Sequence, residues 1–393
     1  MKWKEYSLDE LINIKHGYAF KGEFFSEEPT DDILLTPGNF AIGGGFKAQK
    51  LKYYNGDFPV DYILDENDVI VTMTDLSKEA DTLGFSAKVP AWYGKRFLHN
   101  QRIGLVKLKT DDFDKDYLYW LMRTFSYQRF VANGATGATV KHTSPTKICQ
   151  YKFTAPDDKT TQRKIASILS AYDDLIENNL KRIKLLEEKA FLRYKQIVRE
   201  EKLEKYILSD FGDIITGKTP STTIADYFGD DVPFIKTPDM HNQIFIEHTD
   251  QMLSELGAKS QEKKFLPPLS LCVSCIGTAG VVGITSKPSQ TNQQINSIVF
   301  NEPKNVYFFY ALMSQMKEQL DALGSNGSTF TNVNKNKFEN MEVFIPNQKV
   351  LNEFAEEFEP PFSLILTLQK QNTKLREARD ILLPKLMNGQ IEV

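Results

Sequence analysis

Two short motifs in the chain have residue types and spacings that could support metal or redox chemistry. Cys272-Val273-Ser274-Cys275 has the spacing of redox pairs and zinc ligands, but it lies in an apolar stretch and no second pair completes a zinc site. Buried small residues in a strand are therefore the better interpretation. Pro238-Asp239 with Glu247-His248-Thr249 approximates a nuclease metal site but lacks the final lysine. Neither motif predicts a catalytic centre.

A third motif, Glu359-Pro360-Pro361-Phe362, is similar to the Asp/Asn-Pro-Pro-Tyr/Phe signature of amino-methyltransferases. In that signature a side-chain carbonyl or carboxylate holds the target amine. Here no glycine-rich cofactor loop after a strand accompanies it, and it lies at a predicted helix kink. We identify no catalytic set, and we expect this chain to bind neither a metal ion nor a cofactor of its own.

Charge is unevenly distributed along the chain, although the net charge is only −4. Between Asp81 and Asp111 there is no acidic residue, and none occurs between Glu262 and Glu302. A lone lysine is usually a solvated surface residue, but a basic cluster without acidic neighbours should lack internal salt-bridge partners and suits a phosphate backbone. The basic candidates for DNA contact are Lys88, Lys95, Arg96, His99 and Arg102 in the first stretch and Lys263, Lys264 and Lys287 in the second.

Polar loops supply a second set of candidate DNA contacts, because Ser, Thr, Asn and Gly can approach phosphates closely and bond to base edges. Two loops are rich in glycine and precede a long helix. Their candidates are Thr136, Thr139, Lys141 and His142 in the first loop and Asn326, Thr329, Thr331 and Asn332 in the second. Two other loops follow Thr-Pro pairs, with Asn39, Phe40 and Lys47 in one and Asp239, Met240 and His241 in the other. Capping and turn formation would account for the residues of the glycine loops equally well. Ordinary sequence divergence between the two copies would account equally well for the loops after the Thr-Pro pairs.

These loops fall at matching places in an internal repeat. Four residues near the start recur 200 positions later: Tyr6, Leu8, Ile14 and Gly17 as Tyr206, Leu208, Ile214 and Gly217. Five residues around the glycine loop recur at an offset of 190: Gly134, Gly137, Thr139, Lys147 and Pro156 as Gly324, Gly327, Thr329, Lys337 and Pro346. Asn100-Gln101 and Asn292-Gln293 also match. Because a sequence-specific contact should differ between copies, we interpret the Asn-Gln pairs as structural, at the start of a strand.

Each copy is predicted to be a globular α+β block of about 150 residues, the size of an ordinary domain. Strand-like runs lie at 33–35, 68–73, 103–108, 234–236, 269–276 and 295–300. One amphipathic helix is expected before each glycine loop, at 116–130 and 306–323.

A long helical pattern follows each block. From 160 to 202 apolar residues recur every seven positions: Leu169, Ile176, Ile183, Ala190 and Ile197. A second pattern from 350 to 383 contains Leu368, Leu375 and Leu382, and Pro360 and Pro361 predict a break near its start. We expect the two helices to pair antiparallel as a rod of roughly 60 Å. The predicted boundaries are 1–157, 158–202, 203–347 and 348–393.

This arrangement, with Leu382-Leu383-Pro384-Lys385-Leu386-Met387-Asn388-Gly389-Gln390-Ile391 ending the second helix, resembles the specificity subunit of type I restriction-modification systems. The resemblance covers the whole chain. It implies an α+β fold with two target-recognition domains separated by two long, coiled-coil-like antiparallel helices in a pseudo-twofold molecule. It also implies that each domain reads one half of a bipartite DNA target without catalysis.

The resemblance further implies partners for the helices. Two methyltransferase subunits would dock on them, restriction and translocase subunits would join through the complex, and S-adenosylmethionine, ATP and Mg²⁺ would be bound by these partners only. Apolar positions that could face a partner, beyond the seam between the helices, are Tyr172, Leu180, Phe191, Tyr194, Leu364 and Leu366.

The remaining sequence features limit the alternatives. No apolar run reaches membrane-spanning length, residues 1–10 are polar, and three cysteines suit a reducing compartment, so the cytoplasm is the expected location.

Two other functions stay open. The chain could be a coiled-coil adaptor that binds only proteins, or a methyltransferase or nuclease whose active site we do not recognise. Binding of random duplexes tests the first alternative, and S-adenosylmethionine bound by the isolated chain would favour the second.

Overall fold

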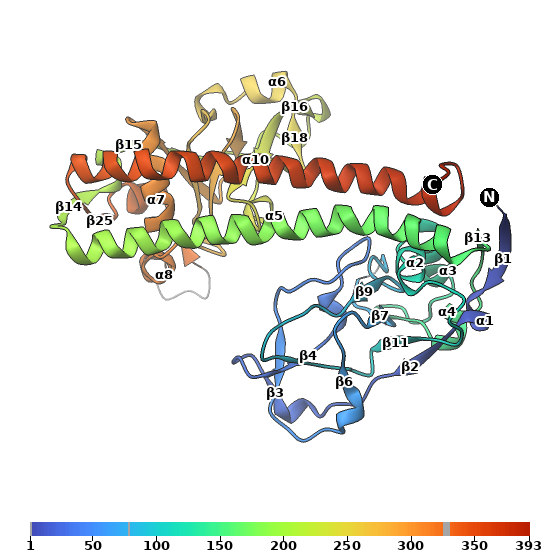
Figure 1. Ribbon diagram of the computed structural model, residues 1–393. Helices are drawn as coiled ribbons and strands as arrows, with labels where there is room; N and C mark the ends of the chain where they lie inside the picture. Colours follow the sequence, from blue (N-terminus) through green and yellow to red (C-terminus); the bar gives the residue numbers. More distant parts are fainter. Residues whose placement is uncertain (1, 78, 325–330) are drawn as a thin grey trace. The chain divides into compact units, whose positions relative to one another are not determined.

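The computed structural model describes residues 2–77, 79–324 and 331–393 of the chain (Figure 1). It divides into two compact units: unit 1 extends to Asp174 and includes Arg376–Val393, and unit 2 is Leu175–Leu375. The two long helices, α5 (Lys159–Glu200) and α10 (Gln348–Met387), each contribute one segment to each unit. Each unit is therefore described by itself.

Unit 1 is built on a four-stranded antiparallel sheet. Its strands are, in spatial order, β2 (Ile12–His16), β11 (Ile103–Leu108), β7 (Val69–Thr72) and β9 (Ser86–Lys88). A second sheet of short strands has the order β3 (Phe25–Ser26), β5 (Lys52–Tyr54), β4 (Asp32–Leu34), β10 (Arg96–Leu98) and β6 (Ile63–Leu64), with β4 and β10 parallel. Two strand pairs complete the unit: β1 (Trp3–Ser7) with β13 (Lys152–Pro156), and β8 (Thr74–Asp75) with β12 (Lys141–His142).

Unit 2 repeats this plan. Its main sheet has the order β15 (Gly212–Thr216), β23 (Ile295–Phe300), β19 (Leu271–Ser274), β21 (Val282–Thr285) and β17 (Phe245–Ile246). A smaller sheet contains β18 (Met252–Leu253), β16 (Phe228–Ile235) and β22 (Gln290–Thr291), with β16 and β22 parallel. The two strand pairs are β14 (Glu204–Ile207) with β25 (Glu342–Ile345), and β20 (Ile276–Gly277) with β24 (Thr331–Asn332).

The connectivity of the two units confirms the internal repeat that the sequence predicts. In each main sheet the first long strand pairs antiparallel with the last, and the last pairs with the middle strand. Each unit also joins its first strand to the strand that precedes a long helix. The α+β class and the predicted long strands are confirmed as well. The predicted domain boundaries and the pseudo-twofold symmetry stay predictions.

The helix before each glycine loop differs from the prediction, because there are two short helices in place of one. Unit 1 has α2 (Lys115–Leu121) and α3 (Phe125–Asn133), and unit 2 has α7 (Val306–Met313) and α8 (Lys317–Gly324). Thr124 separates the first two, because its side chain accepts a hydrogen bond from the backbone of Tyr127 and so starts a new helix. The remaining short helices are α1 (Leu8–Leu11), α4 (Pro145–Cys149), α6 (Glu255–Lys259) and α9 (Lys335–Glu339).

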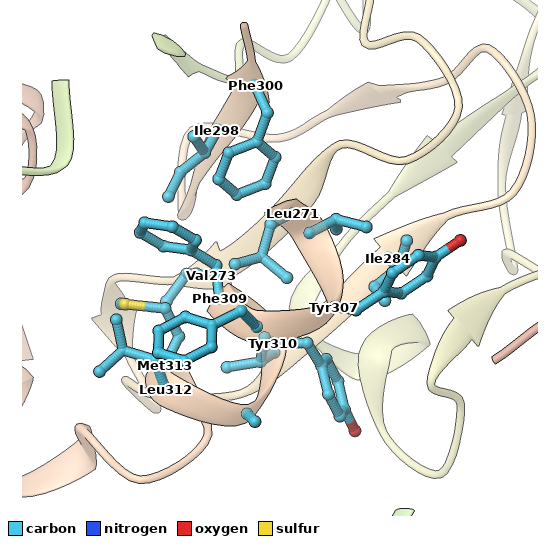
Figure 2. Close-up of a cluster of buried hydrophobic side chains, with 14 of the residues drawn as sticks. Leu271, Val273, Ile284, Ile298, Phe300, Tyr307, Phe309, Tyr310, Leu312 and Met313 are labelled. Atoms are coloured by element: carbon cyan, nitrogen blue, oxygen red, sulfur yellow. The ribbon is translucent and has the colours of Figure 1, made fainter. Parts of the chain in front are cut away.

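Each core lies between the main sheet and the first of these helices. All eight residues of α7 are buried, so this helix offers apolar side chains on every face. Figure 2 shows Phe309, Leu312 and Met313 of α7 beside side chains of β19 and β23. In unit 1 the fully buried Tyr117 and Trp120 of α2 occupy the corresponding core.

The long helices pair antiparallel within each unit, as predicted. In unit 1, Ile165 and Leu169 of α5 share a core with Leu383 and Leu386 of α10. In unit 2, Ala190 and Tyr194 of α5 share a core with Phe354 and Phe358 of α10, and Arg193 pairs with Glu357. In the same unit the buried amides of Asn179 and Asn372 form a hydrogen bond of 2.9 Å.

The predicted break at Pro360 and Pro361 is wrong, because α10 runs without interruption through both prolines. Each proline removes one backbone hydrogen bond. The flanking Phe358 and Phe362 are fully buried in the core of unit 2. Tertiary packing of this kind commonly outweighs a local preference against helix.

Candidate nucleic-acid interface

The basic cluster predicted at Lys88 to Arg102 has acidic partners, so the premise that it lacks internal salt bridges is wrong. Three of its side chains pair with aspartates that are distant in sequence: Lys88 with Asp116 at 2.9 Å, Lys95 with Asp31 at 3.0 Å and Arg96 with Asp32 at 2.6 Å. Arg96 binds its carboxylate through two nitrogens, and this contact raises the pKa of its guanidinium. Exposed pairs of this kind contribute little to stability, but they reduce the positive field available to DNA.

His99 is removed from the candidate contacts because its side chain is fully buried. Its Nε2 bonds to the carbonyl of Ile103 at 2.9 Å. Burial lowers the pKa of the imidazole to about 4. The ring is therefore neutral at physiological pH and has no surface for a phosphate to contact.

Arg102 is the one member of the cluster that is exposed and takes part in none of the ion pairs found among the described residues. It lies in the turn before β11, where the side chain of Asn100 accepts a hydrogen bond from the Arg102 backbone at 3.0 Å. The Arg102 carbonyl accepts from Met73, and the Met73 carbonyl accepts from Thr143. Three loops therefore meet at Met73, and Arg102 projects from one of them.

The glycine loop of unit 1 is another of these three loops. Thr136 and His142 exchange two backbone hydrogen bonds, and His142 Nδ1 lies 3.1 Å from the hydroxyl of Thr74. Thr139 is exposed and Lys141 is half-buried. We call the surface formed by these loops the turn face of unit 1. Its residues are Leu76, Gln101, Arg102, Thr136, Thr139, Lys141 and His142.

Unit 2 has a turn face built in the same way. Asn292 accepts from the backbone of Gln294, the Gln294 carbonyl accepts from Cys275, and the Cys275 carbonyl accepts from Val333. Asn100 and Asn292 thus accept the same backbone hydrogen bond, from the residue two positions later, which confirms their interpretation as structural residues at the start of a strand. The residues of this turn face are Gly277, Thr278, Gln293, Gln294, Thr331 and Asn332. The predicted contacts Asn326 and Thr329 lie outside the described residues.

The turn faces differ in chemistry although their backbones match. The face of unit 1 carries the cations of Arg102 and Lys141. The face of unit 2 presents amides and hydroxyls, with glutamine at the position of Arg102. Two surfaces of the same shape and different side chains could distinguish two different base sequences.

The loops after the Thr-Pro pairs need a correction. Asn39 and Asp239 are buried and accept equivalent bonds of 2.8 Å, from the backbone of Thr36 and of Lys236. Phe40 and Met240 are buried in the cores of their own units. These four side chains fix the loops and leave no surface for DNA, so only the exposed Lys47 and His241 remain candidates there.

The lysines of unit 2 include one that sequence reasoning missed. Lys263 and Lys264 of the 3-10 helix η7 (Glu262–Lys264) line a hollow of about 430 Å³ beside β15, together with Lys335 of α9. Lys335 also lies 3.8 Å from Glu339. Lys335 follows the glycine loop in sequence, which is the signal that could have identified it. Lys287 is exposed in another loop.

Three of the six predicted partner-facing residues belong instead to the core of unit 2. Tyr194 is buried, and burial raises its pKa to about 12. Phe191 stacks on Tyr310, and Leu366 packs against the same core. Leu180 and Leu364 are exposed, and Tyr172 is half-buried. Sequence reasoning missed six exposed apolar residues of the long helices: Ile168, Leu175, Leu185, Leu192, Val198 and Ile381.

The motifs considered for chemistry have structural roles. Cys272 in β19 and Cys275 directly after it are buried, which confirms the interpretation as buried small residues, and burial raises the pKa of the two thiols to about 12 and about 11. Glu359 pairs with Lys304 at 2.8 Å. Among the described residues there is no group of three His, Cys, Asp or Glu side chains that could hold a metal ion. The described helices also include none with the length and apolar character needed to cross a membrane.

Comparison with known proteins adds a family and several relatives. A family model described as the type I restriction modification DNA specificity domain matches residues 1–188 and again residues 200–374. The HindI specificity subunit of a type I restriction enzyme from Haemophilus influenzae is 46% identical over 190 residues, which cover 48% of this chain and 41% of that relative. The MjaIX specificity subunit from Methanocaldococcus jannaschii is 27% identical over 304 residues, covering 71% of this chain and 69% of the relative.

Among solved structures, the S subunit of a type I restriction-modification system from M. genitalium has a similar fold. The TM-score is 0.60 at 15% identity, and the match covers 98% of this chain and 96% of the other. The fold described above is thus shared over nearly the full length of both chains.

Proposed function

The chain belongs to the type I restriction modification DNA specificity domain family, and from this membership we propose that it is a non-catalytic specificity subunit that reads a two-part DNA sequence. The observation that carries the proposal is the doubled fold, which presents two turn faces of matching backbone and different chemistry. Each unit would contact one half of the target.

The two kinds of contact are divided among different residues. In unit 1 the cations of Arg102 and Lys141 would bind phosphates, while the hydroxyls and imidazole of the glycine loop would bond to base edges. In unit 2 the amides and hydroxyls of the turn face would read bases. The lysines beside β15 would supply the phosphate contacts there.

The long helices would carry the partner proteins. Leu185 and Leu192 lie seven residues apart on α5 and are 64% and 68% exposed. Seven-residue spacing places them on the same side of the helix, and an exposed apolar row suits a protein partner. We assign this row, with Leu180 and Leu364, to the docking of two methyltransferase subunits, through which restriction and translocase subunits would join in the cytoplasm. S-adenosylmethionine, ATP and Mg²⁺ would be bound by these partners.

The experiment that tests the proposal measures binding of the full chain to a pool of random DNA duplexes, with and without a co-expressed methyltransferase subunit. We expect binding whose affinity falls steeply with salt, because phosphate contacts release counterions. A chain that binds the methyltransferase subunit but no DNA in either form would be a protein-only adaptor. Bound S-adenosylmethionine on the isolated chain would favour an enzyme.

A matched pair of variants sharpens this test. Arg102→Gln introduces the residue that unit 2 has at the equivalent turn, and it should reduce the slope of log affinity against log salt by about 0.9 if Arg102 contacts one phosphate. Lys181→Gln removes the same charge from α5, which contributes no residue to either turn face, and should leave the slope unchanged. Equal slopes for the two variants would exclude Arg102 as a phosphate contact.

A further inference from the structure

In unit 1 an ion network around the buried Arg123 ties one loop to both long helices. Asp173 of α5 accepts from Arg123 at 2.5 Å and from Arg379 of α10 at 2.5 Å, through separate carboxylate oxygens. The side chain of Arg123 is only 3% exposed, and its Nε donates to the carbonyl of Gly43 at 3.0 Å. The network therefore connects the segments of α5 and α10 in this unit to the loop 41–45, which follows the 3-10 helix η2 (Pro37–Asn39).

The loop 41–45 is shaped to lie against Arg123. Gly43, Gly44 and Gly45 all have positive φ, between +82° and +96°, which side chains disfavour. A Cβ atom on Gly44 would lie 2.5 Å from Cγ of Arg123, so no side chain fits between the loop and the arginine. Ile42, beside these glycines, is 75% exposed. The backbone of the loop is thus fixed by the arginine while Ile42 faces solvent.

The arginine is itself held in one orientation. Its guanidinium carbon lies 4.2 Å from the centre of the Trp120 ring, and Nη1 donates to the hydroxyl of Tyr119 at 2.7 Å. Hydrogen bonds between charged groups are strong and depend on direction. Arg123 therefore cannot turn without breaking contacts to Asp173, Tyr119 and Gly43 together.

Unit 2 ties β17, the strand that ends its corresponding loop, to α10 with an amide. This loop follows the 3-10 helix η6 (Thr237–Met240). Gln369 of α10 accepts from the backbone N–H of Phe245 and donates to the carbonyl of Phe245, both at 3.0 Å. His248, three residues further on, shares a hydrogen bond of 2.8 Å with Thr373 of α10.

The ionic tie of unit 1 has no ionic counterpart at the matching position of unit 2. Buried positions of α5 recur in α10 at an offset of 189, as Ile165 with Phe354 and Leu169 with Phe358 show. Asp173 then matches Phe362, whose ring contacts those of Phe245, Tyr307 and Tyr310. Apolar packing at such a position avoids the desolvation cost of buried charge. The ionic solution in unit 1 instead fixes the direction of the Arg123 side chain, which apolar packing would not do.

We propose that Asp173, acting through Arg123, and Gln369 are positioning residues that determine sequence specificity, each for the half-site read by its own unit. Asp173 thereby holds the loop after η2, and Gln369 holds β17, where the loop after η6 ends, in a fixed orientation on the long helices. A loop freed from its tie would still approach DNA but would place its side chains less accurately against the bases. The inference rests on the proposed reading of a two-part target.

The test uses the full chain in complex with its methyltransferase subunits and selects preferred duplexes from a randomised library. Asp173→Asn should reduce base preference at one half-site by about tenfold or more, since a well-placed base contact discriminates by about that factor, and should leave the other half-site unchanged. Gln369→Leu should do the reverse. Asp174→Asn, the same change at the exposed neighbouring residue, is the matched control and should leave both half-sites unchanged.

Several results would overturn the inference. One is that the wild-type complex selects a clear two-part motif, but each variant reduces base preference equally at both half-sites. Another is that both variants select the same motif as the wild type and only lower the unfolding temperature. That result would assign the ties to stability alone. If Asp173→Asn does not fold, Gly44→Ala displaces the same loop without changing a charge, and it should affect the same half-site. A wild-type complex that selects no two-part motif would instead contradict the proposed function itself.

Discussion

His99 provides a quantitative test of the structure of unit 1. Burial lowers the pKa of its imidazole from an ordinary 6.5 to about 4. Because the unfolded chain binds the proton more readily, His99 favours the folded state fully above pH 6.5 and loses this contribution as pH falls toward 4. Each unit of pKa is equivalent to about 1.4 kcal/mol. The free energy of unfolding should thus fall by about 2 kcal/mol between pH 7 and pH 5 through this residue alone.

The assay is urea denaturation at pH 7 and pH 5 for the wild-type chain and for His99→Gln, whose amide can still donate to the carbonyl of Ile103. The three tryptophans, Trp3, Trp92 and Trp120, all belong to unit 1, so tryptophan fluorescence reports on that unit alone. The wild type should lose about 2 kcal/mol more than the variant between the two pH values. Parallel losses, or an imidazole that titrates near pH 6.5 in the folded chain by NMR, would refute the buried placement.

Three further perturbations test other parts of the structure. Replacing both Asn179 and Asn372 with leucine should raise the free energy of unfolding by about 1 to 3 kcal/mol. The reason is that the amide nitrogen of Asn372 is buried without a partner among the described residues. An unchanged urea denaturation curve would contradict this prediction. Leu192→Asp should weaken co-purification with a methyltransferase subunit at least tenfold and leave the unfolding temperature unchanged, whereas normal complex formation would exclude that face of α5. Cys272 and Cys275 should not react with a thiol reagent at pH 8 until the chain is unfolded, because burial raises the pKa of both thiols. Mass spectrometry measures the labelling, and fast labelling of the native chain would show that the two thiols are accessible.

The doubled fold could be predicted from the sequence because some repeated residues have no substitutes. Gly17 and Gly217 are examples: a Cβ atom on either would lie 2.1 or 2.2 Å from the carbonyl oxygen of Asn100 or Asn292. A backbone crossing this close requires glycine in both copies. The Asn-Gln pairs recur for a related reason, because each asparagine closes the turn that passes this crossing.

The basic cluster could not be interpreted correctly from the sequence, because absence of acids along the chain does not mean absence of acids in space. Lys95 finds its carboxylate 64 residues away, on Asp31, where β4 and β10 lie side by side as parallel strands. Only the strand pairing reveals this contact. Arg102 lies in the turn before β11, where its side chain is exposed and takes part in none of the ion pairs found among the described residues.

Two other errors have local causes. Pro360 and Pro361 are strong helix-breaking signals, yet the aromatic side chains beside them are held by the core of unit 2 and the helix continues. The loops after the Thr-Pro pairs differ in sequence as two readers of different bases would, but Asn39 and Asp239 are both buried caps that accept the same backbone bond. Sequence difference between copies is therefore no measure of exposure.

The most direct measurement of the central claim maps modified bases across the genome of a host with and without this chain. A chain that reads DNA through two units should be required for methylation at one motif, in which two short specified segments flank a fixed number of unspecified bases. Loss of one such motif and no other on removal of the chain is the predicted result. An unchanged methylation pattern, or loss of a single uninterrupted motif, would contradict the account.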